Sequence, residues 1–116
     1  MSYLINSSFG PEDIERATVP FVLANAAQTR GNAMAFLTGG ALNLVTKSRD
    51  TGTVAPGYTP VSDLVDKFVE AGGTIVVCKI CAAAMNIEDG DLIDGAEIGG
   101  ATNTMDFLEA GGKVLV

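Results

Sequence analysis

The chain has 116 residues, 47% of them apolar, and one domain spanning residues 1–116 accounts for this length. Its fourteen acidic residues exceed its seven basic ones, and the net charge of −7 repels phosphate backbones, which excludes nucleic acid as a partner. No apolar stretch approaches the ~20 residues of a membrane-spanning helix and no secretory signal opens the chain, so we expect a soluble cytoplasmic protein with reduced thiols and no contact with a membrane.

The first part of the chain predicts two strands with a helix between them. A short strand is expected at 3–5, and a strand buried on both faces at 33–37, where five apolar residues follow one another. The helix is expected to open on Pro11 with acidic residues in its first turn, which suits the positive end of the helix dipole. Pro20 falls inside this helix and removes an amide donor, so we expect a kink or a break there. A second, short helix is expected at 41–46.

The middle of the chain predicts a surface loop followed by an amphipathic helix. Residues 48–58 hold Ser, Arg, Asp, Thr, Gly and Pro, a composition typical of loops. Thr59 is the predicted helix cap and Pro60 the predicted first helical residue. Apolar residues recur in this helix at three- and four-residue spacing, and the pair Gly72-Gly73 is expected to end it.

The remaining residues predict three strands and two helices. The strands are expected at 74–77, 96–98 and 113–116. A short helix is expected at 80–85, and another, capped by Thr102 or Asn103, is expected to run to Ala110. Strand and helix thus alternate along the chain, which favours an α/β fold with a mostly parallel sheet and helices on both of its faces.

Cys78 and Cys81 form the most informative motif, a Cys-Lys-Ile-Cys segment at the end of the best predicted strand. Sites in parallel sheets form at the carboxyl ends of strands, where loops lead into the amino ends of helices. A helix amino end favours the reactive thiolate form of Cys78, and Lys79 acts in the same direction. Five acidic residues between positions 88 and 97 oppose this effect if they lie close. The sequence therefore leaves the pKa of the Cys78 thiol open.

Other interpretations of the two cysteines remain. One or both can be small buried apolar residues without chemistry. A zinc site needs further ligands, because the chain has two cysteines and no histidine, and we predict neither a metal nor a cofactor. Thiol exchange between the two is chemically possible, although a thioredoxin-like fold places a later cis-proline against its sulfurs and all four prolines here precede the motif. The absence of histidine excludes Ser-His-Asp and Cys-His hydrolase sites.

Four segments carry a resemblance to known proteins, namely Val77–Cys81, Asn86-Ile87, Leu92–Gly99 and Lys113–Val116. In these segments the chain resembles the DsrE/DsrF-like family, and most closely its YchN-like branch. The resemblance implies a three-layer α/β/α domain of the flavodoxin/Rossmann-like kind, with a mostly parallel sheet of about five strands. It also implies a homo-oligomer, either a trimer or a hexamer.

The resemblance further implies a role for each site residue. Several relatives carry sulfur as a persulfide on a cysteine that follows a strand and precedes an aliphatic residue by nine positions, and Cys78 stands nine positions before Ile87. Cys81 corresponds to the second cysteine of the YchN-like branch. Relatives commonly have Arg-Gly where this chain has Met85-Asn86, which leaves Lys79 as the local cation for an anionic sulfur group.

From these residues we predict a sulfur-relay protein, acting as a sulfur carrier or sulfurtransferase. Cys78 takes sulfur from a donor protein and passes it to a cysteine of an acceptor protein, and Cys81 can resolve the adduct as a disulfide. The first alternative is a non-catalytic oligomeric binding or structural protein of the same fold, favoured by the missing arginine and the nearby acids. The second alternative is a dithiol redox module.

Overall fold

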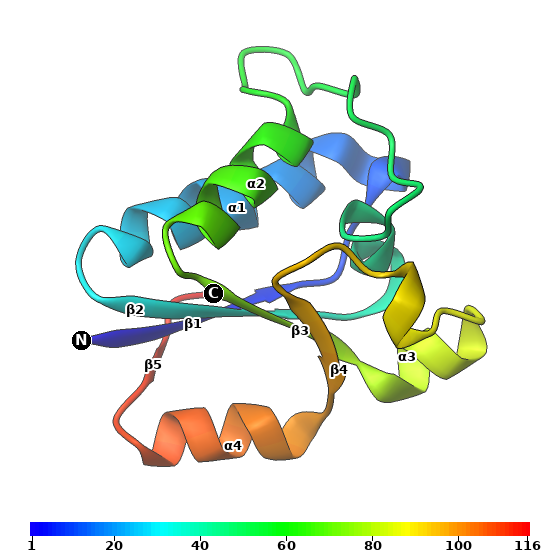
Figure 1. Cartoon of the computed structure of the whole chain (residues 1–116). Coiled ribbons are helices and arrows are strands. Elements are labelled where there is room, and N and C mark those ends of the chain that lie inside the picture. The colour runs from blue at the N-terminus through cyan, green and yellow to red at the C-terminus, as the bar shows by residue number, and fades with distance from the viewer.

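A five-stranded parallel sheet forms the centre of the molecule, which confirms the predicted α/β fold class (Figure 1). The structure is a computed structural model that describes all 116 residues. The strands are β1 (Ser2–Ser7), β2 (Asn32–Leu37), β3 (Thr74–Cys78), β4 (Ala96–Gly99) and β5 (Lys113–Val114). Their order in space is β4-β3-β2-β1-β5, and every neighbouring pair is parallel.

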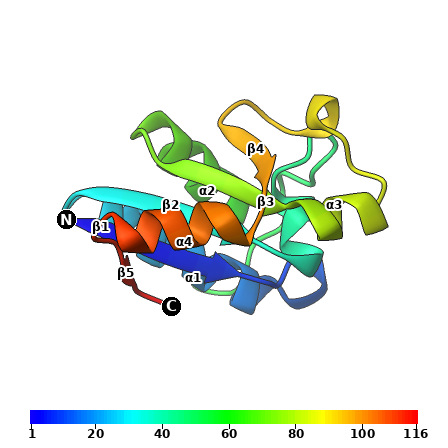
Figure 2. The ribbon, with the colours of Figure 1, turned by 90° about the horizontal axis from the view of Figure 1, so that it is seen from below.

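Four α-helices and three 3-10 helices connect the strands. They are α1 (Ile14–Gln28), α2 (Val61–Glu70), α3 (Lys79–Ala84), α4 (Ala101–Glu109), η1 (Pro11–Asp13), η2 (Gly39–Leu44) and η3 (Asp89–Asp91). Helices α1 and α2 cover one face of the sheet, α4 covers the other, and α3 lies beyond the carboxyl end of β3 (Figures 1 and 2). None of these helices combines the length and hydropathy needed to cross a bilayer.

The handedness of the connections explains this division. Connections between parallel strands of one sheet are almost always right-handed, so the direction of each crossover decides which face its helix covers. The crossover through α1 connects β1 to β2, and the crossover through α2 connects β2 to β3, so both move across the sheet in the same direction. The crossover through α4 runs back across the sheet from β4 to β5, and α4 therefore covers the opposite face.

Two apolar clusters hold the layers together. The larger one has 19 buried residues and fills the space between the sheet and helices α1 and α2, where the rings of Phe21 and Phe68 meet edge to face with centroids 6.2 Å apart. The smaller one consists of Leu4, Met34 and Val76, with Phe107 of α4 packed against it. Successive strand residues face opposite sides, so each central strand contributes side chains to both clusters.

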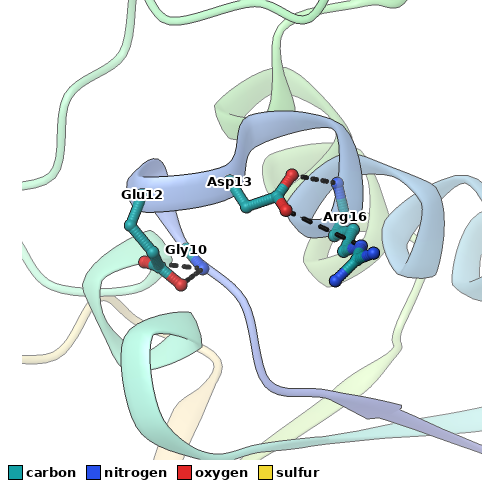
Figure 3. A network of polar contacts seen from close by, with 4 residues as sticks. All are labelled: Gly10, Glu12, Asp13 and Arg16. Carbon is teal, nitrogen blue, oxygen red and sulfur yellow. Dashed lines mark hydrogen bonds and ion pairs between the residues drawn. The ribbon is translucent and has the colours of Figure 1, made fainter.

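A network of polar contacts fixes the start of α1 (Figure 3). The helical turn predicted at Pro11 belongs to η1, and α1 itself begins three residues later. The Gly10 N–H donates to both carboxylate oxygens of Glu12, at 3.1 and 3.0 Å. Asp13 caps α1 by accepting a hydrogen bond from the Arg16 backbone N–H at 3.3 Å, and its carboxylate also forms an ion pair with the Arg16 side chain at 3.6 Å. The predicted acidic residues therefore act before α1 as well as at its cap.

Helix α1 continues through Pro20, so the expected break does not occur. A proline inside a helix removes one backbone hydrogen bond, here the one to the Arg16 carbonyl. The helix continues because its inner face is buried both before and after the proline. Ala17 is the buried residue before it, and Phe21 and Ala24 are buried after it. Burial of this face offsets the single lost hydrogen bond.

Three other boundaries differ from the prediction. Helix α2 begins at Val61, because Pro60 has an extended ψ of 135° and serves as the N-cap instead of the first helical residue. The short helix predicted at 41–46 is the 3-10 helix η2. The strand predicted at 113–116 is limited to the two residues of β5, although Leu115 still donates a backbone hydrogen bond to Leu4.

The burial of Phe68 generates a test of this core. Its ring is fully buried between Phe21 and the glycine turn after α2, so Phe68→Ala leaves a cavity. We expect the free energy of unfolding to fall by about 3–5 kcal/mol, measured by urea denaturation. Tyr58→Ala is the control, because Tyr58 lies exposed in the surface loop, and its effect should stay within about 0.5 kcal/mol. Equal effects of the two substitutions would contradict this packing.

Candidate functional site

Cys78 lies where β3 ends and α3 begins. Thr74 to Val77 are β-branched residues that suit a buried strand, whereas the alanines that follow Cys81 favour a helix. The change of preference falls at Cys78, which is the last residue of β3 and the N-cap of α3. Its φ of −62° and ψ of 123° are the extended values typical of an N-cap residue. The predicted position at a strand-to-helix turn is therefore confirmed.

The first turn of α3 stabilises the thiolate of Cys78. The backbone N–H groups two and three residues after an N-cap point back toward its side chain, and here they belong to Ile80 and Cys81. They form no cap hydrogen bond with the Cys78 sulfur, but they lower the pKa of its thiol, with the Cys81 N–H as the main cause. Partial burial acts against the shift, while the Cys81 side chain and the Ile80 N–H add to it. The result is a half-exposed thiol that ionises below the usual range of cysteine.

The acidic residues that follow α3 do not oppose this shift. Four of them, Glu88, Asp89, Asp91 and Asp94, lie in or beside η3, beyond the carboxyl end of α3, and no carboxylate is among the causes of the Cys78 shift. The Asp91 carboxylate instead accepts a hydrogen bond from the Glu88 N–H at 2.9 Å, which closes the η3 turn. These acids therefore build a turn, and none of them is a cause of the lowered pKa of Cys78.

Lys79 is exposed beside Cys78 and reaches toward the start of α4. Its Cε lies 3.9 Å from the position that a Cβ atom would occupy at Gly100. The structure has two ion pairs, Arg16–Asp13 and Arg49–Asp66, and neither involves Lys79. Lys79 lines the cavity at Cys78 and also a second cavity, of about 550 Å³, that Glu88 and Asp89 border.

Cys78 and Lys79 border a cavity of about 520 Å³ between α3 and α4. Its other walls are Phe36 of β2, Ile80 of α3 and the segment from Gly99 to Asn103. The first residues of both helices line it, so both present their amino ends to this space. Amino ends of helices carry unpaired N–H groups and a partial positive charge, which favour an anionic occupant.

The start of α4 takes a different form from the prediction. The cap is Gly100, instead of Thr102 or Asn103. Asn103 occupies the third helical position, and its side-chain oxygen accepts a hydrogen bond from the Gly100 N–H at 3.0 Å. A Cβ at Gly99 would lie 2.5 Å from this oxygen and 2.7 Å from Cγ1 of Val76, so a larger residue there would have to displace one of these side chains.

Met85 and Asn86 lie at the other end of α3. Helix α3 has six residues and is about 9 Å long, so its carboxyl end is well separated from Cys78. Asn86 has a φ of 56°, a left-handed conformation that glycine adopts freely and that asparagine tolerates better than most residues. It can therefore replace the glycine of the family pattern. Met85 borders a separate polar cavity of about 360 Å³, and neither residue lines the cavity at Cys78.

A further cavity, of about 360 Å³, lies where the strand order reverses between β1 and β5. Its polar lining comes from Asn6, Ser8, Glu15 and Arg16. The guanidinium of Arg16 stacks over the ring of Phe9 at 5.2 Å. Ligands of open α/β sheets commonly bind at such a reversal. The sequence could not reveal this cavity, because it does not encode the strand order in any local signal.

The three predicted site residues thus meet in the first turn of α3. Cys78 and Cys81 are both free thiols and both half-buried. Nowhere do three or more His, Cys, Asp or Glu side chains gather in a way that could hold a metal ion. The arrangement offers a stabilised thiolate, a second thiol one turn away and a free cation, which together suit sulfur exchange chemistry.

The comparisons with known proteins agree with this picture. Among solved structures, the chain is similar to the YchN protein from E. coli, with a TM-score of 0.79 and 20% identity over 99% of this chain and 97% of that one. It is also similar to MTH1491 from Methanobacterium thermoautotrophicum, a protein of unknown function, with a TM-score of 0.70 and 11% identity over 98% and 96% of the two chains. No curated protein matches the chain.

At these identities the solved structures support the fold, and the predicted likeness to YchN is confirmed at that level. The family comparison goes further, because the DsrE/DsrF-like family matches residues 1–116 without interruption. From end to end, then, this chain belongs to the DsrE/DsrF-like family.

Proposed function

We propose that the protein relays sulfur as a persulfide on Cys78. Membership of the DsrE/DsrF-like family suggests sulfur relay at the level of the family. The observation that carries the proposal for this chain is the placement of Cys78 as the N-cap of α3, where backbone N–H groups lower the pKa of its thiol. The thiolate is the form of cysteine that attacks a persulfide.

The chemistry needs two exchanges. In the first, the Cys78 thiolate attacks the outer sulfur of a donor persulfide, a bond forms between the two sulfurs, and the donor leaves as a thiolate. In the second, a thiolate of the acceptor attacks the outer sulfur now held on Cys78, and Cys78 leaves as a thiolate. The pKa of Cys78 is lowered, so Cys78 is a good leaving group in the second exchange as well as an available nucleophile in the first.

The surroundings of Cys78 suit the carried sulfur. The outer sulfur of a persulfide is readily anionic, and the cavity between α3 and α4 receives it among helix amino ends, with the Lys79 ammonium at its border. Ile80 stands beside Cys78 with 74% of its surface exposed. An apolar side chain in this position can contact a donor or acceptor protein while sulfur is exchanged. We place this activity in the cytoplasm, where thiols remain reduced.

The proposal predicts which cysteine takes up sulfur. The variants Cys81→Ser and Cys78→Ser each retain one thiol, and each is incubated with inorganic polysulfide, desalted and measured by intact mass. We expect Cys81→Ser to gain about one sulfur per chain and Cys78→Ser to gain none, because the first-turn N–H groups act on Cys78. Equal uptake by both variants would contradict the assignment, and so would uptake by Cys78→Ser alone.

A second candidate is a non-catalytic oligomer of the same fold. The observation in its favour is the set of exposed apolar side chains on α4 and on the carboxyl-terminal segment, and α4 has no fully buried residue. Met105 of α4 and Val114, Leu115 and Val116 of the carboxyl-terminal segment are all exposed. In such a protein Cys78 would be an inert residue. A homo-oligomer is compatible with both candidates, and we propose one, as a trimer or a hexamer.

Alkylation separates the two candidates. The rate of Cys78 labelling by iodoacetamide, followed between pH 5 and 10 by peptide mapping, reports the ionisation of this thiol. We expect a midpoint below the value of about 8.5 for an unperturbed cysteine. The reason is that the N–H groups of Cys81 and Ile80 stabilise the thiolate. A midpoint at or above about 8.5, with slow labelling, would support the inert oligomer instead.

The exposed apolar surface generates a prediction of assembly. β5 is an edge strand with two residues, and Val114 is 57% exposed on it. We expect light scattering coupled to gel filtration to give a mass above that of one chain, and Val114→Lys to shift the distribution toward the monomer, because a charge on an edge strand opposes apolar contact. The control is Val22→Lys on α1. A monomeric parent chain would contradict the proposed assembly.

A further inference from the structure

The second thiol of the motif stands directly behind Cys78 in the first turn of α3. Cys78 is the N-cap and Cys81 the third helical residue. Side chains of a helix lean toward its amino end, so the Cys81 side chain leans toward the Cys78 sulfur. The side chain and the backbone N–H of Cys81 both help to lower the pKa of the Cys78 thiol, as close neighbours do. The two sulfurs are therefore neighbours.

Cys81 and Cys78 differ in their surroundings. Cys78 borders the open cavity, whereas Cys81 does not line it and packs against the large apolar cluster beneath α3. A donor that enters the cavity thus meets Cys78 first. Cys81 is placed to react with whatever Cys78 carries, and far less with the donor itself.

The spacing of the two residues suits a covalent bond between them. Residues three apart at the start of a helix have Cα atoms about 5 Å apart. This lies within the range of about 4.4–6.8 Å that disulfides require. Both cysteines are free in this structure, so the pair is in its reduced form. A bond can form within α3 without a rearrangement of the fold.

We propose that Cys81 attacks the persulfide on Cys78, which releases the carried sulfur as sulfide and joins the two cysteines in a disulfide. This activity rests on the proposed persulfide on Cys78 and adds a second fate for the sulfur. In the absence of an acceptor protein, the chain reduces the sulfur itself, and it returns to the dithiol form through a dithiol reductant.

The step balances without any further oxidant. The Cys81 sulfur attacks the inner sulfur of the persulfide, which is the Sγ of Cys78. A Cys78–Cys81 bond forms, the bond from Cys78 to the outer sulfur breaks, and the outer sulfur leaves as hydrosulfide with the electron pair of that bond. The two cysteines are oxidised and the outer sulfur is reduced to sulfide. The proton of the Cys81 thiol passes to solvent or to the hydrosulfide.

Three versions of the full chain test this step. The first is the parent, and the second is Cys81→Ser, which has no second thiol. The third is the double variant Cys81→Ala with Ala83→Cys, which keeps two thiols but moves the second to an exposed position on another face of α3. Each is loaded with inorganic polysulfide, rapidly desalted, and followed over time by intact mass and by trapping of released sulfide.

For the parent we expect the form with one added sulfur to convert to a disulfide form, whose mass is that of the unloaded chain less two hydrogens. About one sulfide per chain should be released. Peptide mapping should find the Cys78–Cys81 disulfide. The Cys81→Ser and displaced-thiol variants should retain the added sulfur at least tenfold longer. A parent that keeps its added sulfur as long as Cys81→Ser would overturn the inference and leave the relay on Cys78 intact. If Cys81→Ser takes up no sulfur at all, the relay and the inference both fail.

Discussion

The interaction on which the site depends is the attraction between the first-turn N–H groups of α3 and the Cys78 sulfur, which lowers the pKa of this thiol. It exists only because a buried strand passes into a helix without an intervening loop, so that one residue is both the end of β3 and the N-cap of α3. The strand is held on both faces, by Ile75 and Val77 in the large cluster and by Val76 in the small one. The two cores therefore fix the direction in which the sulfur is presented, and a shift of β3 by one residue would place Cys78 on the wrong side of the sheet.

The topology of the sheet supplies the rest of the site. Because the last crossover runs back from β4 to β5, α4 begins at the carboxyl edge, next to the start of α3. The tight turn at Gly99 and Gly100 lets the two helices approach and leaves the cavity open between them. The start of α3 thus lowers the pKa of the Cys78 thiol, and the start of α4 forms the facing wall of the cavity. The site that we propose needs both helices, one for the thiol and one for the space beside it.

Local patterns predicted the parts of the structure that local forces decide. The β-branched run before Cys78 and the alanines after it located the strand-to-helix junction, and the motif was found at that junction.

Properties that depend on distant residues could not be predicted in this way. The influence of the acidic residues on Cys78 required the position of η3, and the continuity of α1 through Pro20 required the burial of its inner face. The predicted cap of α4 was wrong because Asn103 lies inside the helix, where its side chain accepts a hydrogen bond from the Gly100 N–H. In the sequence, an asparagine at this position looks the same as an asparagine that caps the helix. The strand order, and with it the cavity between β1 and β5, has no local signal.

The Cys-x-x-Cys motif here has the geometry that makes such motifs reactive, in a fold that differs from thioredoxin. The first cysteine lies at a helix start, where backbone N–H groups lower the pKa of its thiol, and the second lies one turn behind it. This arrangement follows from the helix alone, whatever the fold around it. The departure at Met85 and Asn86 lies at the end of α3, whereas the groups that lower the pKa of the Cys78 thiol lie at its beginning. These groups are the backbone N–H groups of positions 80 and 81, which every residue except proline supplies.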